Sequence, residues 1–434
     1  MDESPILWYH IVMKKQILRK VYKYRIYQTN TQQEILEKQL SLCRWLYNRF
    51  LEERKRAYEK DKTRIPCFDQ INKIPGLKKE KPELQIVYSQ ALQDVAKRLD
   101  KAFQNFFRRV KENKQGKRQK LGYPRFKGYW RYDSFVYPQS GFELKDNKLN
   151  LSKIGNITIK FHRPIEGSIK TLTIRRTRTN KWYACFSTEG NKRIPEKKNI
   201  INTVGIDMGL NSFLTTNTGE KVDNPRYLKE SEEKLAKLQR RHSKKKLKSK
   251  NRSKSRLKVA RLHEKITNQR QDFLHKLSYK LVKNFQLIAF EKLNIKGMTR
   301  NKYLAKSISD ASWNRFLQML SYKAAEAGIW ALGVNPKNTT QVCSRCGDIV
   351  SKTIATKIHK CPKCRLFIDR DINAARNILQ LALQSFSEKN LGGLALNTVG
   401  TMGINACGVE RILSTTKQEA TVFNGGSSHP LFFK

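Results

Sequence analysis

Acidic residues and long apolar stretches are what this sequence has least of. Its 434 residues contain 37 Asp and Glu against 88 Lys and Arg, which gives a formal net charge of +51. No run of about twenty apolar residues occurs, so a membrane-spanning helix is not expected, and the lack of an amphipathic anchor disfavours a basic protein of the membrane surface. The first residues also lack the basic start and apolar core of a signal peptide, so we expect a cytoplasmic protein.

Cysteine is scarce as well, with eight in the chain. Four of them show no pairing pattern, which argues against a disulfide framework and for a reducing compartment; these are Cys43, Cys67, Cys185 and Cys407. The other four form two Cys-x-x-Cys pairs separated by fourteen residues, and these are Cys343, Cys346, Cys361 and Cys364. Four thiolates at this spacing are typical of a closed, tetrahedral zinc site, and the alternative is four buried free thiols. We predict a structural zinc site.

The excess of positive charge is spread along nearly the whole chain and would attract any polyanion. With 38% hydrophobic residues the chain can still build cores, so nucleic acid is the partner that fits best. The densest stretch, 240–258, has eleven Lys or Arg among nineteen residues and no acid, and bound phosphate would offset this self-repulsion. The candidate ligands of nucleic acid in this stretch are Arg240, Arg241, Lys244, Lys245, Lys246 and Lys248.

A second basic stretch, 111–131, interleaves aromatic residues with Lys and Arg, among them Arg125 and Lys127. Basic side chains contact a nucleic-acid backbone while aromatic rings stack on bases. The rings in question are Tyr123, Phe126, Tyr129 and Trp130. A flexible loop anchored by these aromatics explains the pattern equally well, and the sequence leaves both interpretations open.

The first part of the chain shows the patterns of a small β-barrel interrupted by helices. Residues 18–27 alternate apolar and basic side chains, which predicts a half-buried strand. Apolar residues at helical spacing predict helices over about 31–50 and 88–107, the first opened by a capping-box pattern at Thr31 and Glu34. Further strand patterns lie between turns rich in Gly, Asn and Pro, at 149–151, 157–161, 169–175 and 182–188.

A second unit begins at residue 203, and three acids in it have unusual positions. Asp207 lies within an apolar strand, Glu291 ends a later buried strand, and Asp371 opens the last helix. An acid in such a strand is costly unless it is paired, so each one alone could be the partner of a Lys or Arg. Together, in the order strand, strand, helix, they fit a ribonuclease-H-like α/β nuclease domain whose carboxylates hold Mg²⁺ or Mn²⁺ for phosphodiester hydrolysis.

Six motifs carry a resemblance to a known family. They read Tyr-Lys-Tyr-Arg-Ile-Tyr at 22–27, Tyr-Pro-Arg-Phe-Lys at 123–127, Gly-Ile-Asp-Met-Gly at 205–209, Phe-Glu-Lys-Leu-Asn-Ile-Lys-Gly-Met at 290–298, Asn-Thr-Thr-Gln-Val-Cys-Ser-Arg-Cys-Gly at 338–347 and Asp-Arg-Asp-Ile-Asn-Ala-Ala at 369–375. In combination they resemble TnpB (OrfB), a family of transposon-encoded proteins related to type V CRISPR effectors. The likeness covers about residues 18–383.

The resemblance implies an RNA-guided DNA endonuclease, which takes a transposon-derived guide RNA and cuts target double-stranded DNA beside a short flanking motif. By motif match, Asp207, Glu291 and Asp371 would be the catalytic acids that bind Mg²⁺, with Asp369 in a supporting role. The alternatives are a compact type V CRISPR effector and a cleavage-deficient, RNA-guided DNA-binding regulator. A nucleoid-associated prokaryotic protein is expected, with a monomer favoured.

The resemblance also implies an α+β multidomain architecture with defined boundaries. These are an N-terminal extension at 1–17, a wedge-type β-barrel at 18–30 and 124–195, a helical recognition insert at 31–123, a RuvC-like nuclease domain at 203–337 and 369–385, a zinc ribbon at 338–368 and a disordered tail at 386–434.

Two positions depart from the family pattern. Lys292 stands where an acid often follows the motif glutamate, which would alter the electric field at the metals. Arg365 stands where glycine often follows the last cysteine. This second departure puts only the turn of that zinc knuckle in question.

Overall fold

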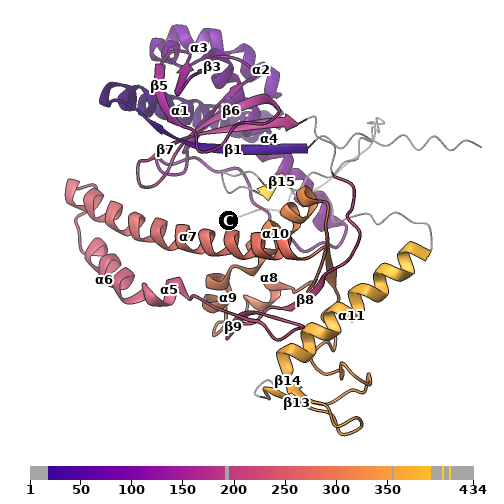
Figure 1. Ribbon diagram of the computed structural model, residues 1–434. Helices are drawn as coiled ribbons and strands as arrows, with labels where there is room; N and C mark the ends of the chain where they lie inside the picture. The colour runs from indigo at the N-terminus through magenta and orange to yellow at the C-terminus, as the bar shows by residue number, and fades with distance from the viewer. Residues whose placement is uncertain (1–17, 191–194, 354–355, 392–402, 405–409, 412–434) are drawn as a thin grey trace, which may run out of the picture.

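Figure 1 shows the computed structural model of the chain, which describes residues 18–190, 195–353, 356–391, 403–404 and 410–411. The expected N-terminal extension lies outside the described residues. So does most of the expected disordered tail, although the last long helix continues to Leu391. Within the described part of the chain, no helix combines the length and the apolar character needed to cross a membrane.

A seven-stranded antiparallel sheet forms the first unit. Its strand order is β2-β6-β7-β1-β5-β4-β3. The strands are β1 (Leu18–Tyr27), β2 (Ser134–Pro138), β3 (Phe142–Lys145), β4 (Lys148–Leu151), β5 (Gly155–Lys160), β6 (Ser168–Arg176) and β7 (Trp182–Gly190). The two edge strands, β2 and β3, follow each other in the chain, and the Tyr137 hydroxyl of the first donates to the Ser152 carbonyl just beyond β4. The sheet is therefore a nearly closed barrel, close to the expectation.

The alternation in β1 has the predicted effect. Tyr22, Tyr24 and Ile26 are buried, whereas the basic residues between them point to the other face. There, the Lys23 ammonium lies 4.2 Å from the centre of the Tyr183 ring. This cationic face is thus partly covered by an aromatic side chain of β7.

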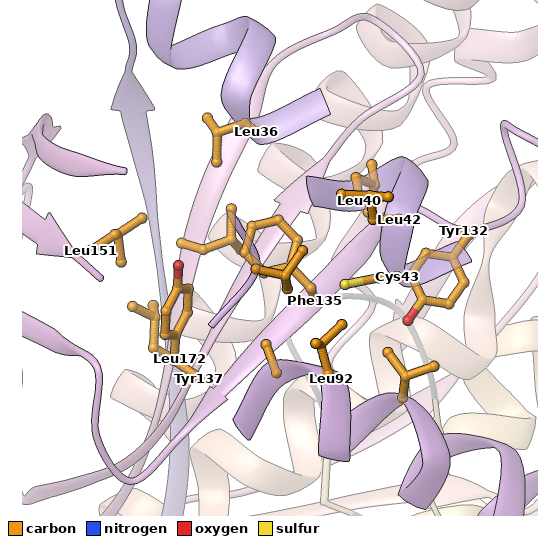
Figure 2. Close-up of a cluster of buried hydrophobic side chains, with 14 of the residues drawn as sticks. Leu36, Leu40, Leu42, Cys43, Leu92, Tyr132, Phe135, Tyr137, Leu151 and Leu172 are labelled. Carbon is orange, nitrogen blue, oxygen red and sulfur yellow. The ribbon is translucent and has the colours of Figure 1, made fainter. Parts of the chain in front are cut away.

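Helices between β1 and β2 cover the barrel. They are α1 (Asn30–Asp61), α2 (Cys67–Asn72), α3 (Ile74–Glu80), the 3₁₀ helix η1 (Pro82–Ile86) and α4 (Ser89–Lys114). Figure 2 shows how apolar side chains of α1 and α4, such as Leu40, Cys43 and Leu92, pack against Phe135 of β2 and its neighbours. Cys43 is fully buried, so it fills the core as expected for an unpaired cysteine.

The capping box predicted at Thr31 and Glu34 is wrong by two residues. The Thr29 hydroxyl accepts from the Gln32 N–H at 3.2 Å, and the Gln32 side chain accepts from the Thr29 N–H at 3.1 Å. The Gln32 amide also donates to the carbonyl of Asn156 at the start of β5. This contact with a distant strand favours the earlier cap, and local sequence could not reveal it.

The second unit contains a five-stranded mixed sheet in the order β10-β9-β8-β11-β12. The strands are β8 (Thr203–Asp207), β9 (Ser212–Thr216), β10 (Lys221–Asp223), β11 (Leu287–Glu291) and β12 (Trp330–Val334). Strands β8, β9 and β10 form an antiparallel meander, whereas β11 runs parallel to both β8 and β12. Parallel neighbours end at the same edge of the sheet, which brings the ends of β8 and β11 together.

Helices cover both faces of this sheet. They are α5 (Tyr227–Glu230), α6 (Glu232–Ser243), α7 (Lys250–Asn284), α8 (Ile295–Met298), α9 (Ala305–Ala311), α10 (Trp313–Ala327) and α11 (Arg370–Leu391). Ile288 and Phe290 of β11 face a core formed with α7 and α10. Leu287 and Ala289, on the opposite face, pack against Ile378 of α11. Because β11 is buried on both faces, its sequence is continuously apolar instead of alternating.

A small module lies between β12 and α11 and contains the four clustered cysteines. Its paired strands are β13 (Ile358–Lys360) and β14 (Phe367–Asp369), and a bridge joins Val342 to Ile349. In Figure 1 the module lies at the lower end of α11, at the opposite side of the molecule from the barrel. Beyond α11, the described residues form one short pair, β15 (Gly403–Ile404) and β16 (Glu410–Arg411).

Candidate functional site

Three elements bring the predicted acids toward one edge of the five-stranded sheet. Asp207 ends β8 and Glu291 ends the neighbouring parallel strand β11, one residue beyond the pair Ile206 and Phe290. Asp371 lies in the first turn of α11, which packs across β8. Gly205 makes this packing possible, because a Cβ atom at that position would lie 2.1 Å from the Ala375 carbonyl oxygen. The glycine of the Gly-Ile-Asp motif thus sets how closely α11 approaches the strand.

The electrostatics of Asp207 show that the three acids interact. The pKa of its carboxyl is raised to about 8, first because neighbouring protein shields it from water and then because Glu291 and Asp371 add negative charge. Arg370 and the Met208 backbone N–H work in the opposite direction. Glu291 is only 6% exposed, and burial also raises its pKa. Like charges in a shielded corner are costly unless a cation offsets them.

The spacing of these acids differs from that of the cysteines. Among the described residues, the four cysteines are the group of three or more whose ligand atoms all lie within 4.8 Å of one another. The three carboxylates are spread more widely than that. Two ions about 3.5–4 Å apart share their ligands over a larger volume than one ion does, so the wider spacing is compatible with a pair of cations.

Asp369 supports the site through the backbone. Its Oδ1 accepts from the N–H groups of Asp371 at 2.8 Å and Ile372 at 3.3 Å, which caps the start of α11. Its Oδ2 pairs with the Lys221 ammonium of β10 at 2.7 Å. Burial alone would raise the pKa of Asp369, but these hydrogen bonds outweigh it and lower the pKa. The residue that was expected to have a supporting role therefore caps the helix that carries Asp371.

The four cysteines have the geometry of a tetrahedral thiolate site. The Sγ atoms of Cys343 and Cys364 are 3.5 Å apart, as are those of Cys346 and Cys361. A zinc ion with Zn–S bonds of about 2.3 Å would require Sγ–Sγ edges of about 3.8 Å, so small adjustments would accommodate it. The pKa of Cys361 is lowered to about 7, first by the backbone N–H of Cys364, whereas burial raises the pKa of Cys364 to about 12. The residues present fit a structural zinc ion.

Both knuckle turns have the same shape. After the first cysteine pair, Gly347 has φ +78°, and its N–H donates to the Cys343 carbonyl at 2.9 Å. After the second pair, Arg365 has φ +60°, and its N–H donates to the Cys361 carbonyl at 3.0 Å. The arginine therefore takes up the left-handed conformation of the glycine that it replaces, at a cost in backbone strain.

Lys292 is not among the residues whose charges shift the pKa of Asp207. Its aliphatic chain packs against Gly333 of β12, where a Cβ atom would lie 2.7 Å from the Lys292 Cγ. The side chain is exposed, and the charges that shift the pKa of Asp207 are those of other residues. The expectation that this lysine alters the field at the metals gains no support from its position.

The basic stretch 240–258 forms the end of α6, a tight loop and the start of α7. Its candidate ligands of nucleic acid are all exposed, and they are Arg240, Arg241, Lys244, Lys245, Lys246 and Lys248. Arg252 and Arg256 have structural roles instead. The Arg252 guanidinium donates to the carbonyls of His242 and Lys245, which closes the loop.

The predicted loop 111–131 begins later than expected, because α4 continues to Lys114, and the loop that follows is held by its aromatic residues. Tyr123 packs edge-on against Phe103 of α4. Two guanidinium groups contact the Trp130 ring, that of Arg256 of α7 at 3.6 Å from the ring centre and that of the buried Arg176 of β6 at 4.8 Å. These contacts favour the anchoring interpretation for this part of the loop, and they join the barrel to the second unit.

The two basic candidates in this loop differ. Arg125 is exposed. Lys127 is half-buried, with its ammonium 5.5 Å from the Tyr47 ring, and burial lowers its pKa. Its backbone N–H also donates to the Asn48 side chain. Arg125 is thus better placed than Lys127 to contact phosphate.

Residues without a predicted role connect the cysteine module to the acids. The Thr339 hydroxyl donates to Glu291 Oε1, and Asn377 of α11 donates to the Thr339 carbonyl at 2.8 Å. Asn373 donates to the Val342 carbonyl at 2.7 Å and accepts from the Ser344 N–H at 2.9 Å. The available signal was their place in the sequence, since Thr339 and Asn373 belong to the motifs 338–347 and 369–375 and Asn377 lies one helical turn after Asn373.

Comparison with known proteins agrees with these features. A protein of Streptomyces pristinaespiralis with the provisional name RNA-guided DNA endonuclease is 35% identical over 375 residues, covering 85% of this chain and 90% of that protein. The chain belongs to the TnpB (OrfB) family. A second relative, InsQ of Escherichia coli K12, has the same provisional name and is 28% identical, covering 83% of this chain and 91% of its own length.

Family profiles match three parts of the chain. Residues 185–302 match the OrfB profile described as "Probable transposase", and 313–378 match the "Cas12f1-like, TNB domain" profile. Residues 13–63 match a profile called "Helix-turn-helix domain", although the described part of this stretch forms β1 and α1. The resemblance to TnpB that the motifs indicate is confirmed.

Relatives from CRISPR systems are more distant. Cas12f1 of Sulfoacidibacillus thermotolerans is 31% identical over 122 residues, which cover 28% of this chain. A Cas12f1–sgRNA–target DNA complex aligns over 83% of this chain and 99% of that chain, with 18% identity and a TM-score of 0.31. A score this low does not define a shared fold.

Proposed function

We propose that this protein is an RNA-guided DNA endonuclease of the TnpB type, with Asp207, Glu291 and Asp371 as its catalytic acids. The observation that carries the assignment of the acids is their convergence from β8, β11 and α11 at one sheet edge, where two of them raise the pKa of the third. The chain-long similarity to proteins provisionally named as such endonucleases supports the activity.

Divalent cations would relieve the repulsion between these acids. Mg²⁺ and Mn²⁺ prefer carboxylate oxygens, and a bound pair would activate water and stabilise the leaving oxygen of a phosphodiester. The protein's own part is to hold the carboxylates in place. Gly205 lets α11 lie against β8, and Asp369 caps the turn that carries Asp371.

We assign the five-stranded sheet to a RuvC-like, ribonuclease-H-like nuclease domain. In support, an antiparallel meander is extended on one side by two parallel strands, with acids at the shared edge. The cysteine module would be its structural zinc ribbon. The seven-stranded barrel would be the wedge domain, and α1 to α4 the recognition insert.

The partners that we propose are a guide RNA and a target DNA duplex. A net charge of +51 suits a protein that neutralises long stretches of phosphate. Base pairing with the guide would select the sequence, so the protein itself needs mainly backbone contacts. The exposed basic end of the α6–α7 hairpin is the first candidate surface for them.

A compact CRISPR effector is the second candidate, favoured by the match of residues 313–378 to the Cas12f1-like domain. Both functions use the same acids and the same chemistry. The RNA that copurifies with the protein distinguishes them, because a transposon end and a CRISPR repeat differ in sequence. A transposon-end RNA would support the TnpB assignment.

The decisive experiment measures cutting and binding separately. Protein, copurified RNA and a matching duplex are assembled with Mg²⁺ or Mn²⁺, and Asp371→Ala is compared with wild type. Loss of one carboxylate should slow cleavage about a thousandfold or more while target binding persists or tightens. The matched control is Asp272→Ala, which removes an exposed acid of α7 far along the chain from the site.

Two outcomes would contradict the proposal. Robust cutting by Asp371→Ala would overturn the assignment of the acids. A wild-type complex that binds its target and never cuts with either ion would instead establish the cleavage-deficient regulator.

A further inference from the structure

The cysteine module contacts a catalytic acid directly. Thr339, at the start of the module, is 3% exposed, and its hydroxyl donates to Oε1 of Glu291, which is also buried. The same hydroxyl oxygen lies 3.2 Å from the Pro336 carbonyl oxygen. A hydroxyl has one proton to donate, so the carboxylate, as the stronger acceptor, takes it.

Helix α11 holds the same segment from the other side. The Asn377 side chain, 5% exposed, donates to the carbonyls of Thr339 at 2.8 Å and Val342 at 2.7 Å. Asn373, fully buried, bonds Val342 and the Ser344 N–H within the first knuckle. The segment 339–344 is therefore clamped between Glu291 on β11 and the helix that starts with Asp371.

We propose that Thr339 is a positioning residue for Glu291, through which the cysteine module fixes the carboxylate that binds the catalytic cation. The inference rests on the proposed function of Glu291. The geometric basis is as simple as a side-chain rotation. The Glu291 carboxylate at the end of β11 can rotate about its side-chain bonds, and a hydrogen bond from Thr339, whose segment is held by α11, restricts that rotation. Hydrogen-bond partners of metal ligands commonly act in this way, and their loss costs about tenfold to a hundredfold in metal affinity.

The arrangement also explains why the first cysteine follows Thr339 so closely. Only three residues separate Thr339 from Cys343, so the knuckle that the thiolates fold is continuous with the contact to Glu291. A structural metal in the module thereby contributes to the order of the nuclease edge. The cysteine module and the acids form one connected unit.

The test compares Thr339→Val with Thr339→Ser in the full-length, zinc-loaded protein. Valine keeps the shape and removes the hydroxyl, whereas serine retains it. Mn²⁺ binding is measured without nucleic acid, from the loss of the free-ion EPR signal, and zinc content and the thermal midpoint are recorded in parallel. We expect Thr339→Val to weaken Mn²⁺ binding about tenfold or more with zinc retained, and Thr339→Ser to stay within about threefold of wild type.

Asp371→Ala separates failure of this inference from failure of the proposed function. If Asp371→Ala binds Mn²⁺ as wild type does, the acids are not the cation site and the proposed function itself falls. If Asp371→Ala weakens binding and zinc-loaded Thr339→Val does not, only the positioning role is overturned. If Thr339→Val fails to fold, Thr339→Ser still tests the inference, because serine keeps the hydroxyl. A folded Thr339→Ser that binds Mn²⁺ tenfold more weakly than wild type would show that the hydroxyl does not position Glu291.

Discussion

The two sheets of this protein handle buried charge in opposite ways. In the barrel, Arg176 is 3% exposed, but its guanidinium donates to the Tyr129 hydroxyl at 2.7 Å and lies 3.8 Å from Glu37. In the five-stranded sheet, burial and the neighbouring Glu291 and Asp371 raise the pKa of Asp207, and Arg370, which pairs with Asp371 at 3.2 Å, offsets this only in part. The buried arginine of the barrel has an acidic side chain nearby, whereas the edge of the second sheet keeps an excess of negative charge that a cation would offset. This difference is the one that the proposed function requires, with the acids of the second sheet as the cation site.

Removal of zinc should have the largest effect, and this effect should be confined to the second unit. The double substitution Cys343→Ser and Cys346→Ser takes away half of the ligands, and structural zinc contributes about 10 kcal/mol or more to the folding of small zinc domains. Metal analysis should fall from about one zinc per chain, the content of a single closed site, to near zero. Hydrogen exchange should show lost protection in 338–369 and in the first turns of α11, with the barrel strands unchanged. Unchanged zinc in the double variant would refute the site.

The second-largest effect should come from adding one methyl group to β8 of the acid-bearing sheet. Gly205→Ala places a Cβ atom 2.1 Å from the Ala375 carbonyl oxygen, so α11 must move away from β8. We expect a loss of about 3 kcal/mol in the free energy of unfolding, at the upper end for overpacking, measured by chemical denaturation. The control is Gly76→Ala in α3, where no atom lies within 4 Å of the new Cβ. It should be neutral or stabilising by up to about 1 kcal/mol, and equal losses in both variants would contradict the packing.

Removal of positive charge tests whether the loop between α6 and α7 or the barrel contacts nucleic acid. Changing Lys244, Lys245 and Lys246 to Gln should flatten the slope of log affinity against log salt by about 2 to 3, since each phosphate contact contributes about 0.7 to 0.9. The matched control removes the same charge from exposed barrel lysines, namely Lys145, Lys148 and Lys160. If the slope changes only in the control, the barrel and not the α6–α7 loop makes the main contact with nucleic acid.

The smallest expected effect compares the two knuckles. Arg365→Gly relieves a left-handed conformation that costs a non-glycine residue about 1–2 kcal/mol, although the unfolded chain gains part of this back in entropy. We expect tighter zinc binding, by about threefold to tenfold, in competition with a chelator. Gly347→Ala should weaken it by a similar factor. An Arg365→Gly variant that binds zinc less tightly than wild type would mean that the arginine side chain itself stabilises the module.

Local patterns predicted much of this architecture, and non-local contacts account for what they missed. The alternation in 18–27 and the apolar run before Glu291 fix strands because burial acts on each residue in turn. The cap at Thr29 is favoured by a contact with Asn156. The position of the Trp130 ring depends on Arg176 and Arg256, which are distant in sequence. Neither could be derived from neighbouring residues.

The candidate site divides in the same way. The cysteine spacing alone predicted the cluster that the structure contains, because four thiolates need only two short turns. The convergence of Asp207, Glu291 and Asp371 remains a prediction about function, supported by strand direction and electrostatics. Thr339 and Asn373 lie within family motifs and Asn377 just beyond one, but their roles could not be predicted, because the role of a buried polar side chain depends on its partner in the fold.

Helix α7 gives the molecule a rigid strut. Its 35 residues, at about 1.5 Å each, span roughly 50 Å. Toward one end, Arg256 donates to the Arg178 carbonyl and Glu264 accepts from Thr179 and Lys181 in the β6–β7 turn of the barrel. Toward the other, Leu274, Leu277 and Leu281 lie in the core beneath the acid-bearing strands. One continuous helix therefore links the β6–β7 turn of the barrel to the core beneath β8 and β11, so under the proposed function a barrel displaced by a bound duplex would also shift the support of the carboxylates.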